Sequence, residues 1–202
     1  MPILKNHNAI FVHIPKTGGT SVLRMFGLEL EVKDFDIYYH QDEIFEYDHA
    51  TAQFLKSLID IKIWDSCYKF ALTRNPYDRL VSEFFWKKKD KDARVIDCNE
   101  IEFPDFIKFL YQNFDHIMSK NHKIKSHFIR QSDFILPEIE LFKYSEIESL
   151  LEKLQEKFGV AKPNKVYNKS PHEPYHTYYD EKLKGMVYDL YYTDFELLGY
   201  KR

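Results

Sequence analysis

The fold of this chain is decided by the stretch Ala9-Ile10-Phe11-Val12-His13-Ile14-Pro15-Lys16-Thr17-Gly18-Gly19-Thr20-Ser21. Its first five residues form a short apolar run ahead of proline and glycine, which predicts a buried strand over residues 9–13. Apolar residues then recur at helical spacing, which predicts a helix from Thr20 to about Leu28. A strand is therefore expected to join a helix through a short glycine-containing turn.

This turn has the chemistry of a cradle for an anion such as phosphate. Its glycines allow the backbone to turn tightly and to approach a ligand, and the start of the following helix offers N–H donors. Hydroxyl groups and one ammonium group add further donors. The candidate binding residues are Lys16, Thr17, Gly18, Gly19, Thr20 and Ser21. The turn differs from a Walker A loop because its lysine precedes the glycine pair, and the alternative interpretation is an ordinary connection with a solvent-facing lysine.

A second strand and helix repeat this arrangement further along the chain. Residues 68–73 predict a buried strand, after which Asn75 is a favourable N-cap and Pro76 fits the first helical position. Arg74 follows the strand directly, at the carboxyl edge of the predicted sheet, where open α/β sheets bind ligands. We therefore expect Arg74 and Ser82 to hold a second phosphate jointly.

We expect two sets of charged side chains in this region to lie on the protein surface. Arg79 is expected to form an ion pair with Glu83 at i,i+4 on the helix surface. The run Lys87–Lys89 is expected to be solvated, with the binding of an acidic glycan as the alternative.

Strands and helices alternate along the rest of the chain. The other predicted elements are helices over 50–59, 104–111, 145–158 and 180–192, a strand over 141–144 and a loop over 161–174. Ser145 and Glu148 form a capping-box pattern for the third of these helices, and Gly159 is its expected stop. This alternation predicts an α/β protein with a P-loop-like, three-layer fold, in which helices flank a mostly parallel central sheet. Since no linker divides the 202 residues, we expect a single domain over 1–202.

Composition and charge exclude several classes of protein. A net charge of -3 argues against nucleic-acid binding through bulk charge. Cys67 and Cys98 are too few for a disulfide framework or a zinc site; two free thiols are expected, with one bridge between them as the alternative. His116, His122 and His127 are not accompanied by cysteine or carboxylate ligands at a known spacing, so no metal site is predicted. The sequence shows no signal peptide or transmembrane run, which makes a cytoplasmic location without a transmembrane anchor the expectation.

In this order, the two motifs resemble those of the sulfotransferase superfamily, in particular the bacterial polysaccharide and Golgi carbohydrate sulfotransferases. Residues 13–21 resemble the family's 5′-phosphosulfate loop, and residues 73–82 resemble its 3′-phosphate motif. The resemblance implies that 3′-phosphoadenosine 5′-phosphosulfate (PAPS) donates a sulfuryl group to an acceptor hydroxyl, which in this group is favoured to be on a carbohydrate. It also implies that Arg74 and Ser82 hold the 3′-phosphate.

A weaker likeness extends over nearly the whole chain. Residues 48–52, 168–170 and 194–200 also resemble family segments. The pair Tyr144-Ser145 departs from the family, in which a glutamate is expected after the late strand. This departure concerns the back of the predicted cofactor pocket.

The resemblance and the chemistry of sulfuryl transfer together suggest catalytic residues. Negative charge builds on the leaving phosphate, so Lys16 is expected to contact the bridging or leaving oxygen. A general base should take the hydroxyl proton, and His49, which opens a helix at the family's position, is the candidate. Glu43 and Glu46 are the alternatives, and His13 is interpreted as a packing residue.

Two other functions remain open at this point. A nucleotide-dependent kinase with an atypical phosphate loop would need a Mg²⁺-binding carboxylate at the end of the second strand, where Thr73 and Arg74 stand instead. A non-catalytic module that binds PAPS or an anionic glycan would keep Lys16 and Arg74 but would tolerate the loss of His49.

Overall fold

The computed structural model of the chain describes residues 3–28, 37–40, 43–46, 49–88, 98–119, 125–163 and 172–202. The chain divides into two compact units. Unit 1 comprises Met1–Thr73 and Asp133–Lys169, and unit 2 comprises Arg74–Ser132 and Ser170–Arg202. The family-like segment 168–170 lies outside the described residues. The single domain expected over 1–202 stays a prediction.

Unit 1 is built on a four-stranded sheet with the order β1-β2-β5-β6. The strands are β1 (Ile3–Leu4), β2 (Ala9–Val12), β5 (Tyr68–Thr73) and β6 (Glu140–Lys143). β5 is parallel to both of its neighbours, whereas β1 is antiparallel to β2. All residues of β2 are buried, as expected for a parallel strand with both faces covered. The mostly parallel sheet predicted from the sequence is confirmed.

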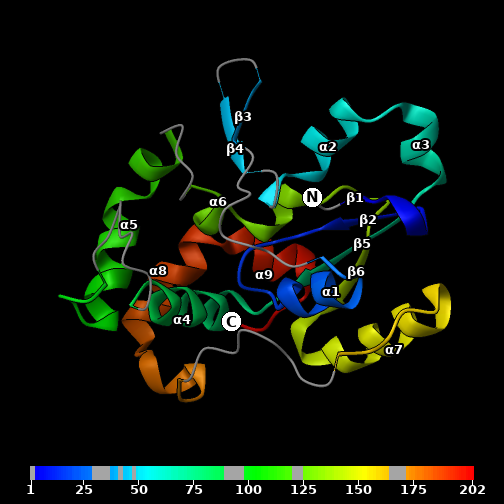
Figure 1. The fold of residues 1–202 in the computed structure, drawn as a ribbon. Coiled ribbons are helices and arrows are strands. Elements are labelled where there is room, and N and C mark those ends of the chain that lie inside the picture. Colours follow the sequence, from blue (N-terminus) through cyan, green and yellow to red (C-terminus); the bar gives the residue numbers. More distant parts are fainter. Residues whose placement is uncertain are drawn as a thin grey trace. The chain divides into compact units, whose positions relative to one another are not determined.

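Helices cover both faces of this sheet (Figure 1). The pair α1 (Gly19–Met25) and α7 (Ile147–Phe158) lies on one face, and the pair α2 (Ala52–Leu58) and α3 (Ile61–Ser66) lies on the other. The core on the side of α1 and α7 includes Phe11, Val22, Leu23, Phe70, Leu72, Leu150, Leu151 and Leu154. Unit 1 therefore has the three layers of the predicted α/β fold.

The remaining elements of unit 1 include short 3-10 helices and a hairpin. They are η1 (Lys5–His7), η4 (Tyr144–Glu146), β3 (Ile37–His40) and β4 (Glu43–Glu46). The predicted capping box of α7 is wrong, because η4 intervenes after β6 and the helix begins only at Ile147. A carboxylate oxygen of Glu146 instead accepts a hydrogen bond from the N–H of Lys143 at 3.3 Å. The predicted stop at Gly159 is confirmed, with a left-handed φ of 67°.

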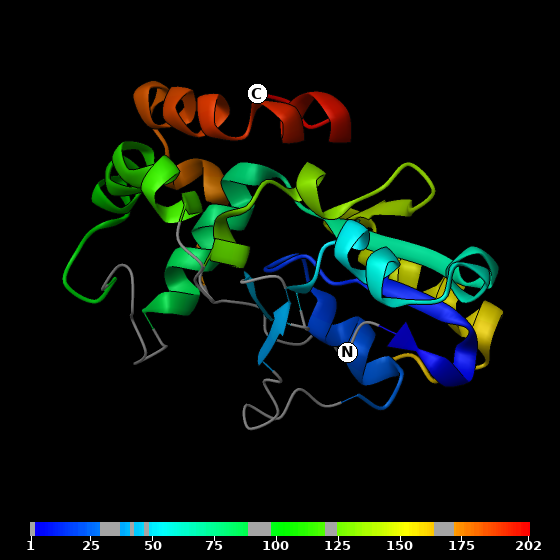
Figure 2. The ribbon, with the colours of Figure 1, turned by 90° about the horizontal axis from the view of Figure 1, so that it is seen from above.

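Unit 2 is helical. Its elements are α4 (Pro76–Lys87), α5 (Phe103–Ser119), α6 (Lys125–Phe128), the 3-10 helix η5 (Tyr175–Tyr178), α8 (Glu181–Leu190) and α9 (Tyr192–Leu198). The short η3 (Gln131–Phe134) begins in unit 2 and ends in unit 1. α5 packs against α8, and Figure 2 shows α8 and α9 following one another. The core is rich in aromatic side chains and includes Tyr77, Phe84, Phe103, Phe106, Phe114, Phe128, Tyr179, Tyr191 and Phe195.

Three helix boundaries in unit 2 test the sequence predictions. α4 begins as predicted, with the side chain of Asn75 accepting the N–H of Tyr77 at 2.9 Å. α5 extends beyond the predicted end at 111, because apolar residues continue at helical spacing to Ile117. The last predicted helix is confirmed as α8, but a further helix, α9, follows it after the buried Tyr191, whose hydroxyl donates to the carbonyl oxygen of Phe128 at 3.0 Å.

Two predictions of surface charge on α4 are wrong. Lys87 is only 4% exposed, although Lys89 of the same run lies outside the described residues. Arg79 is 1% exposed, and its guanidinium donates to the carbonyl oxygens of His127 and Ile129 at 2.9 and 3.0 Å. Other segments of unit 2 cover α4 beyond its apolar stripe, so charged residues outside that stripe are buried as well.

Candidate active site

The loop after β2 holds the first group of candidate residues in a strained shape. Lys16 has a φ of 66°, in the left-handed region that residues other than glycine rarely adopt. Thr17 is fully buried, and its hydroxyl donates to the carbonyl oxygen of Ile14 at 2.8 Å, so this side chain closes the turn from within. Backbone strain of this kind is typical of functional loops that the surrounding structure holds in place.

Close contacts require both glycines of this loop. Gly18 has a φ of 92°, and a Cβ there would lie 2.8 Å from the ring of Tyr144. A Cβ on Gly19 would lie 2.1 Å from Cδ2 and 2.3 Å from Nε2 of His13. A side chain at either position would have to displace a packed ring. Glycine is therefore required at both positions.

His49 lies beside the same loop. Its Nδ1 is 2.9 Å from the carbonyl oxygen of His13, and the two imidazole rings are 4.6 Å apart. Because a carbonyl oxygen can only accept, this contact favours the neutral tautomer with the proton on Nδ1 and the lone pair on Nε2. A general base needs a lone pair that is held in a fixed direction. His13 was expected only to pack, but its backbone also orients His49.

The alternative bases lie on β4. Glu43 and Glu46 are the first and last residues of that strand, and their side chains lie outside the described part of the structure. Among the three candidate bases, the structure therefore describes the side-chain contacts of His49 alone.

In unit 2, the guanidinium of Arg74 is held by Asp78. Nε and Nη2 of Arg74 donate to the two carboxylate oxygens of Asp78 at 2.7 and 2.9 Å. The two side chains are 10% and 21% exposed. This bidentate pair fixes the plane of the guanidinium and uses two of its five N–H donors. Sequence reasoning missed Asp78 as a functional partner, although its i,i+4 spacing from Arg74 was a signal for it.

The structure places the predicted residues in two groups. In unit 1, the loop 13–21 and His49 are brought together through His13. In unit 2, Arg74 immediately precedes the N-cap of α4, and Ser82 lies within this helix with 3% exposure. β2 and β5 run parallel in unit 1, so the loop after β2 leaves the sheet at the edge where β5 ends.

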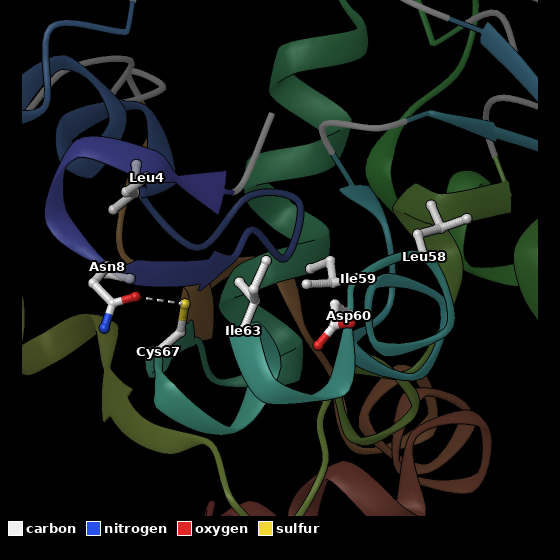
Figure 3. Close-up of a pocket in the computed structure, with 8 residues that line it drawn as sticks. Leu4, Asn8, Leu58, Ile59, Asp60, Ile63 and Cys67 are labelled. Atoms are coloured by element: carbon white, nitrogen blue, oxygen red, sulfur yellow. Dashed lines mark hydrogen bonds between the residues drawn. The ribbon is translucent and has the colours of Figure 1, made fainter.

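A pocket of about 350 Å³ lies at the opposite edge of the unit 1 sheet (Figure 3). Among its lining residues, Asn8 immediately precedes β2 and Cys67 immediately precedes β5. The thiol of Cys67 donates to Oδ1 of Asn8 at 3.3 Å. Cys67 and Cys98 are both buried and neither forms a disulfide, in agreement with the two thiols expected from the sequence. The pocket is separate from the candidate site because it lies at the amino ends of these strands.

A mostly parallel sheet with helices on both faces, and a glycine-containing loop at its carboxyl edge, are typical of α/β proteins that bind phosphate-like anions. Within that class, the sulfotransferase family is matched over residues 2–201, so the chain belongs to this family. Comparisons with curated proteins and with solved structures returned no match.

Two further properties concern only the described part of the chain. Its helices are all too short or too polar to cross a membrane. No group of three or more histidine, cysteine, aspartate or glutamate side chains there is placed to hold a metal ion, and His122 lies outside this part.

Proposed function

We propose that this protein is an enzyme that transfers the sulfuryl group of PAPS to a hydroxyl group of a carbohydrate. The observation that carries the proposal is the glycine-containing loop with its left-handed Lys16, which lies beside an oriented His49 in a chain of the sulfotransferase family. The carbohydrate acceptor is supported by the likeness of the two sequence motifs to those of carbohydrate sulfotransferases.

The residues present fit the two charged ends of PAPS. The loop presents a backbone surface without side chains at Gly18 and Gly19, where a Cβ would meet a packed ring. This surface and the ammonium of Lys16 suit the 5′-phosphosulfate. The guanidinium of Arg74, already held flat by Asp78, suits the 3′-phosphate together with the hydroxyl of Ser82.

The reaction needs a nucleophile, a proton acceptor and stabilisation of the leaving group. The acceptor oxygen attacks sulfur while the bond from sulfur to the bridging oxygen breaks, and that electron pair leaves with 3′-phosphoadenosine 5′-phosphate. The proton of the acceptor hydroxyl passes to Nε2 of His49. Lys16 stabilises the charge that develops on the leaving oxygen, so its contribution is greatest in the transition state.

A product assay tests this proposal directly. Incubation with labelled PAPS and a panel of glycans should yield a sulfated glycan and an equal amount of 3′-phosphoadenosine 5′-phosphate. That nucleotide should also raise the melting temperature of the protein far more than ATP with Mg²⁺ does. Equal stabilisation by ATP, with no sulfated product, would favour a kinase instead.

The role of Arg74 can be tested with two nucleotides that differ only in the 3′-phosphate. Arg74→Ala should weaken binding of 3′-phosphoadenosine 5′-phosphate by about tenfold to a hundredfold, the value of one charge-assisted contact. Binding of adenosine 5′-monophosphate should change little, and the exposed Arg202→Ala serves as a control. Equal weakening of both nucleotides would mean that Arg74 is structural. Isothermal titration calorimetry measures the affinity of each protein for each nucleotide.

A further inference from the structure

The backbone of Arg74 is held on both sides by one side chain. Its N–H donates to Oε1 of Gln131 at 2.8 Å, and its carbonyl oxygen accepts from Nε2 of Gln131 at 2.7 Å. Arg74 lies between the last residue of β5 and the N-cap of α4. It is only 8% exposed, so its two buried peptide groups need partners, and the amide of Gln131 supplies both.

A buried carboxylate in turn orients this amide. Asp194 is fully buried, and its Oδ2 accepts the backbone N–H of Gln131 at 2.9 Å and lies 3.3 Å from Nε2. Its Oδ1 accepts the N–H of Ser132 at 2.9 Å. A carboxylate can accept hydrogen bonds but cannot donate them, so the NH₂ group of Gln131 (Nε2) must face Asp194. The amide oxygen Oε1 then faces the N–H of Arg74. The carboxylate thus sets which way the amide points.

We propose that Gln131, oriented by Asp194, is the positioning residue that allows Arg74 to bind the 3′-phosphate selectively. Asp78 fixes the guanidinium and Gln131 fixes the backbone, so little conformational freedom is left for Arg74 to lose when phosphate binds. The inference rests on the proposed function, since it concerns the residue assigned to the 3′-phosphate.

The measured quantity is a selectivity ratio: the affinity for 3′-phosphoadenosine 5′-phosphate divided by that for adenosine 5′-monophosphate. Gln131→Met keeps the length of the side chain but removes both contacts with Arg74. It should lower the ratio by about tenfold, the effect of weakening one charge-assisted hydrogen bond. Gln131→Asn, measured in parallel, keeps an amide that is too short to reach both groups and should lower the ratio as well.

The matched control is Thr193→Ala. The hydroxyl of Thr193 is 3.1 Å from that of Ser132, so this variant removes a neutral hydrogen bond beside Asp194 and leaves both contacts of Gln131 with Arg74 in place. Its ratio should stay within about twofold of the wild-type value. Near-UV circular dichroism confirms that each variant is folded before its affinities are measured.

A double-mutant cycle separates positioning from general destabilisation. If Gln131 acts through Arg74, then adding Gln131→Met to Arg74→Ala should not lower the ratio further. An unchanged ratio in folded Gln131→Met and Gln131→Asn, or a further fall in the Arg74→Ala background, would overturn the inference and leave the proposed function standing. A wild-type protein with no preference for the 3′-phosphorylated nucleotide would refute the proposed donor and the inference together.

Discussion

Replacement of Lys16 by glycine should make the folded protein more stable than replacement by alanine, although both variants lose the ammonium group. The φ of 66° at Lys16 places an L-residue in the left-handed region, which costs about 1–2 kcal/mol. Alanine keeps this cost, whereas glycine removes it. Glycine also gives the unfolded chain more freedom, which lowers stability by about 0.4–1 kcal/mol.

The balance favours Lys16→Gly over Lys16→Ala by about 1 kcal/mol. For a chain of this size, that difference corresponds to a melting temperature about 2–4 °C higher. Calorimetry of both variants without ligand measures it. In the transfer assay both should lose activity together, with kcat reduced by about 10² or more, because a charge that stabilises the leaving group is absent.

Two results for the Lys16 variants would contradict this reasoning. If Lys16→Ala melts at the same temperature as Lys16→Gly or higher, the lysine is not strained in solution, and the argument from its backbone is wrong. If Lys16→Gly is more stable and still fully active, the strain is real but the ammonium group has no part in the reaction.

Three further changes test other parts of the site and of unit 1. Gly19→Ala should lower the melting temperature, because its Cβ would lie 2.1 Å from an imidazole carbon and overpacking costs about 1–3 kcal/mol, whereas Gly185→Ala meets nothing within 4 Å and should not. His49→Ala should lower kcat by about 10² to 10⁴ and remove the rise of kcat/KM with pH, with nucleotide affinity retained; a variant with an unchanged pH profile would assign the base to one of the β4 glutamates. A hydrogen bond from Lys56 lowers the pKa of Glu138 from 4.5 to about 2, so this carboxylate stabilises the folded state above pH 4.5, and the contribution is lost as the pH falls toward 2. Glu138→Gln should therefore lower the free energy of unfolding slightly at pH 7, by less than about 1 kcal/mol because the pair is about one-third exposed, and the difference in melting temperature from wild type should shrink as the pH falls to 2.

Sequence reasoning predicted the elements whose ends are marked by neighbouring residues. Residues 68–73 form β5 as expected, and the pair Asn75-Pro76 starts α4, because an N-cap and a proline act on the backbone within one turn. Gly159 stops α7 for the same local reason. The loop after β2 was likewise predictable, since its glycines mark a tight turn between an apolar strand and a helix.

The contacts that complete the candidate site could not be predicted in this way. Gln131 lies 57 positions from Arg74, and nothing in its sequence neighbourhood indicates that its amide pairs with a distant peptide group. The steric reason for Gly19 is the ring of His13, whose direction depends on the packing of the whole sheet. Arg79 follows the i,i+4 rule for a surface ion pair, but segments of unit 2 that are distant in sequence bury it.

A transplant of the loop after β2 into another parallel sheet would not reproduce the candidate site if it carried only the lysine and the glycines. The ring of His13 occupies the space that a side chain on Gly19 would need, and the carbonyl of the same residue orients His49. The smallest unit that could be transferred is therefore discontinuous in sequence, because residues 13–19 and the segment that contains His49 must be moved together. A designer who moved the loop alone would transfer the proposed binding residues and leave behind the proposed general base.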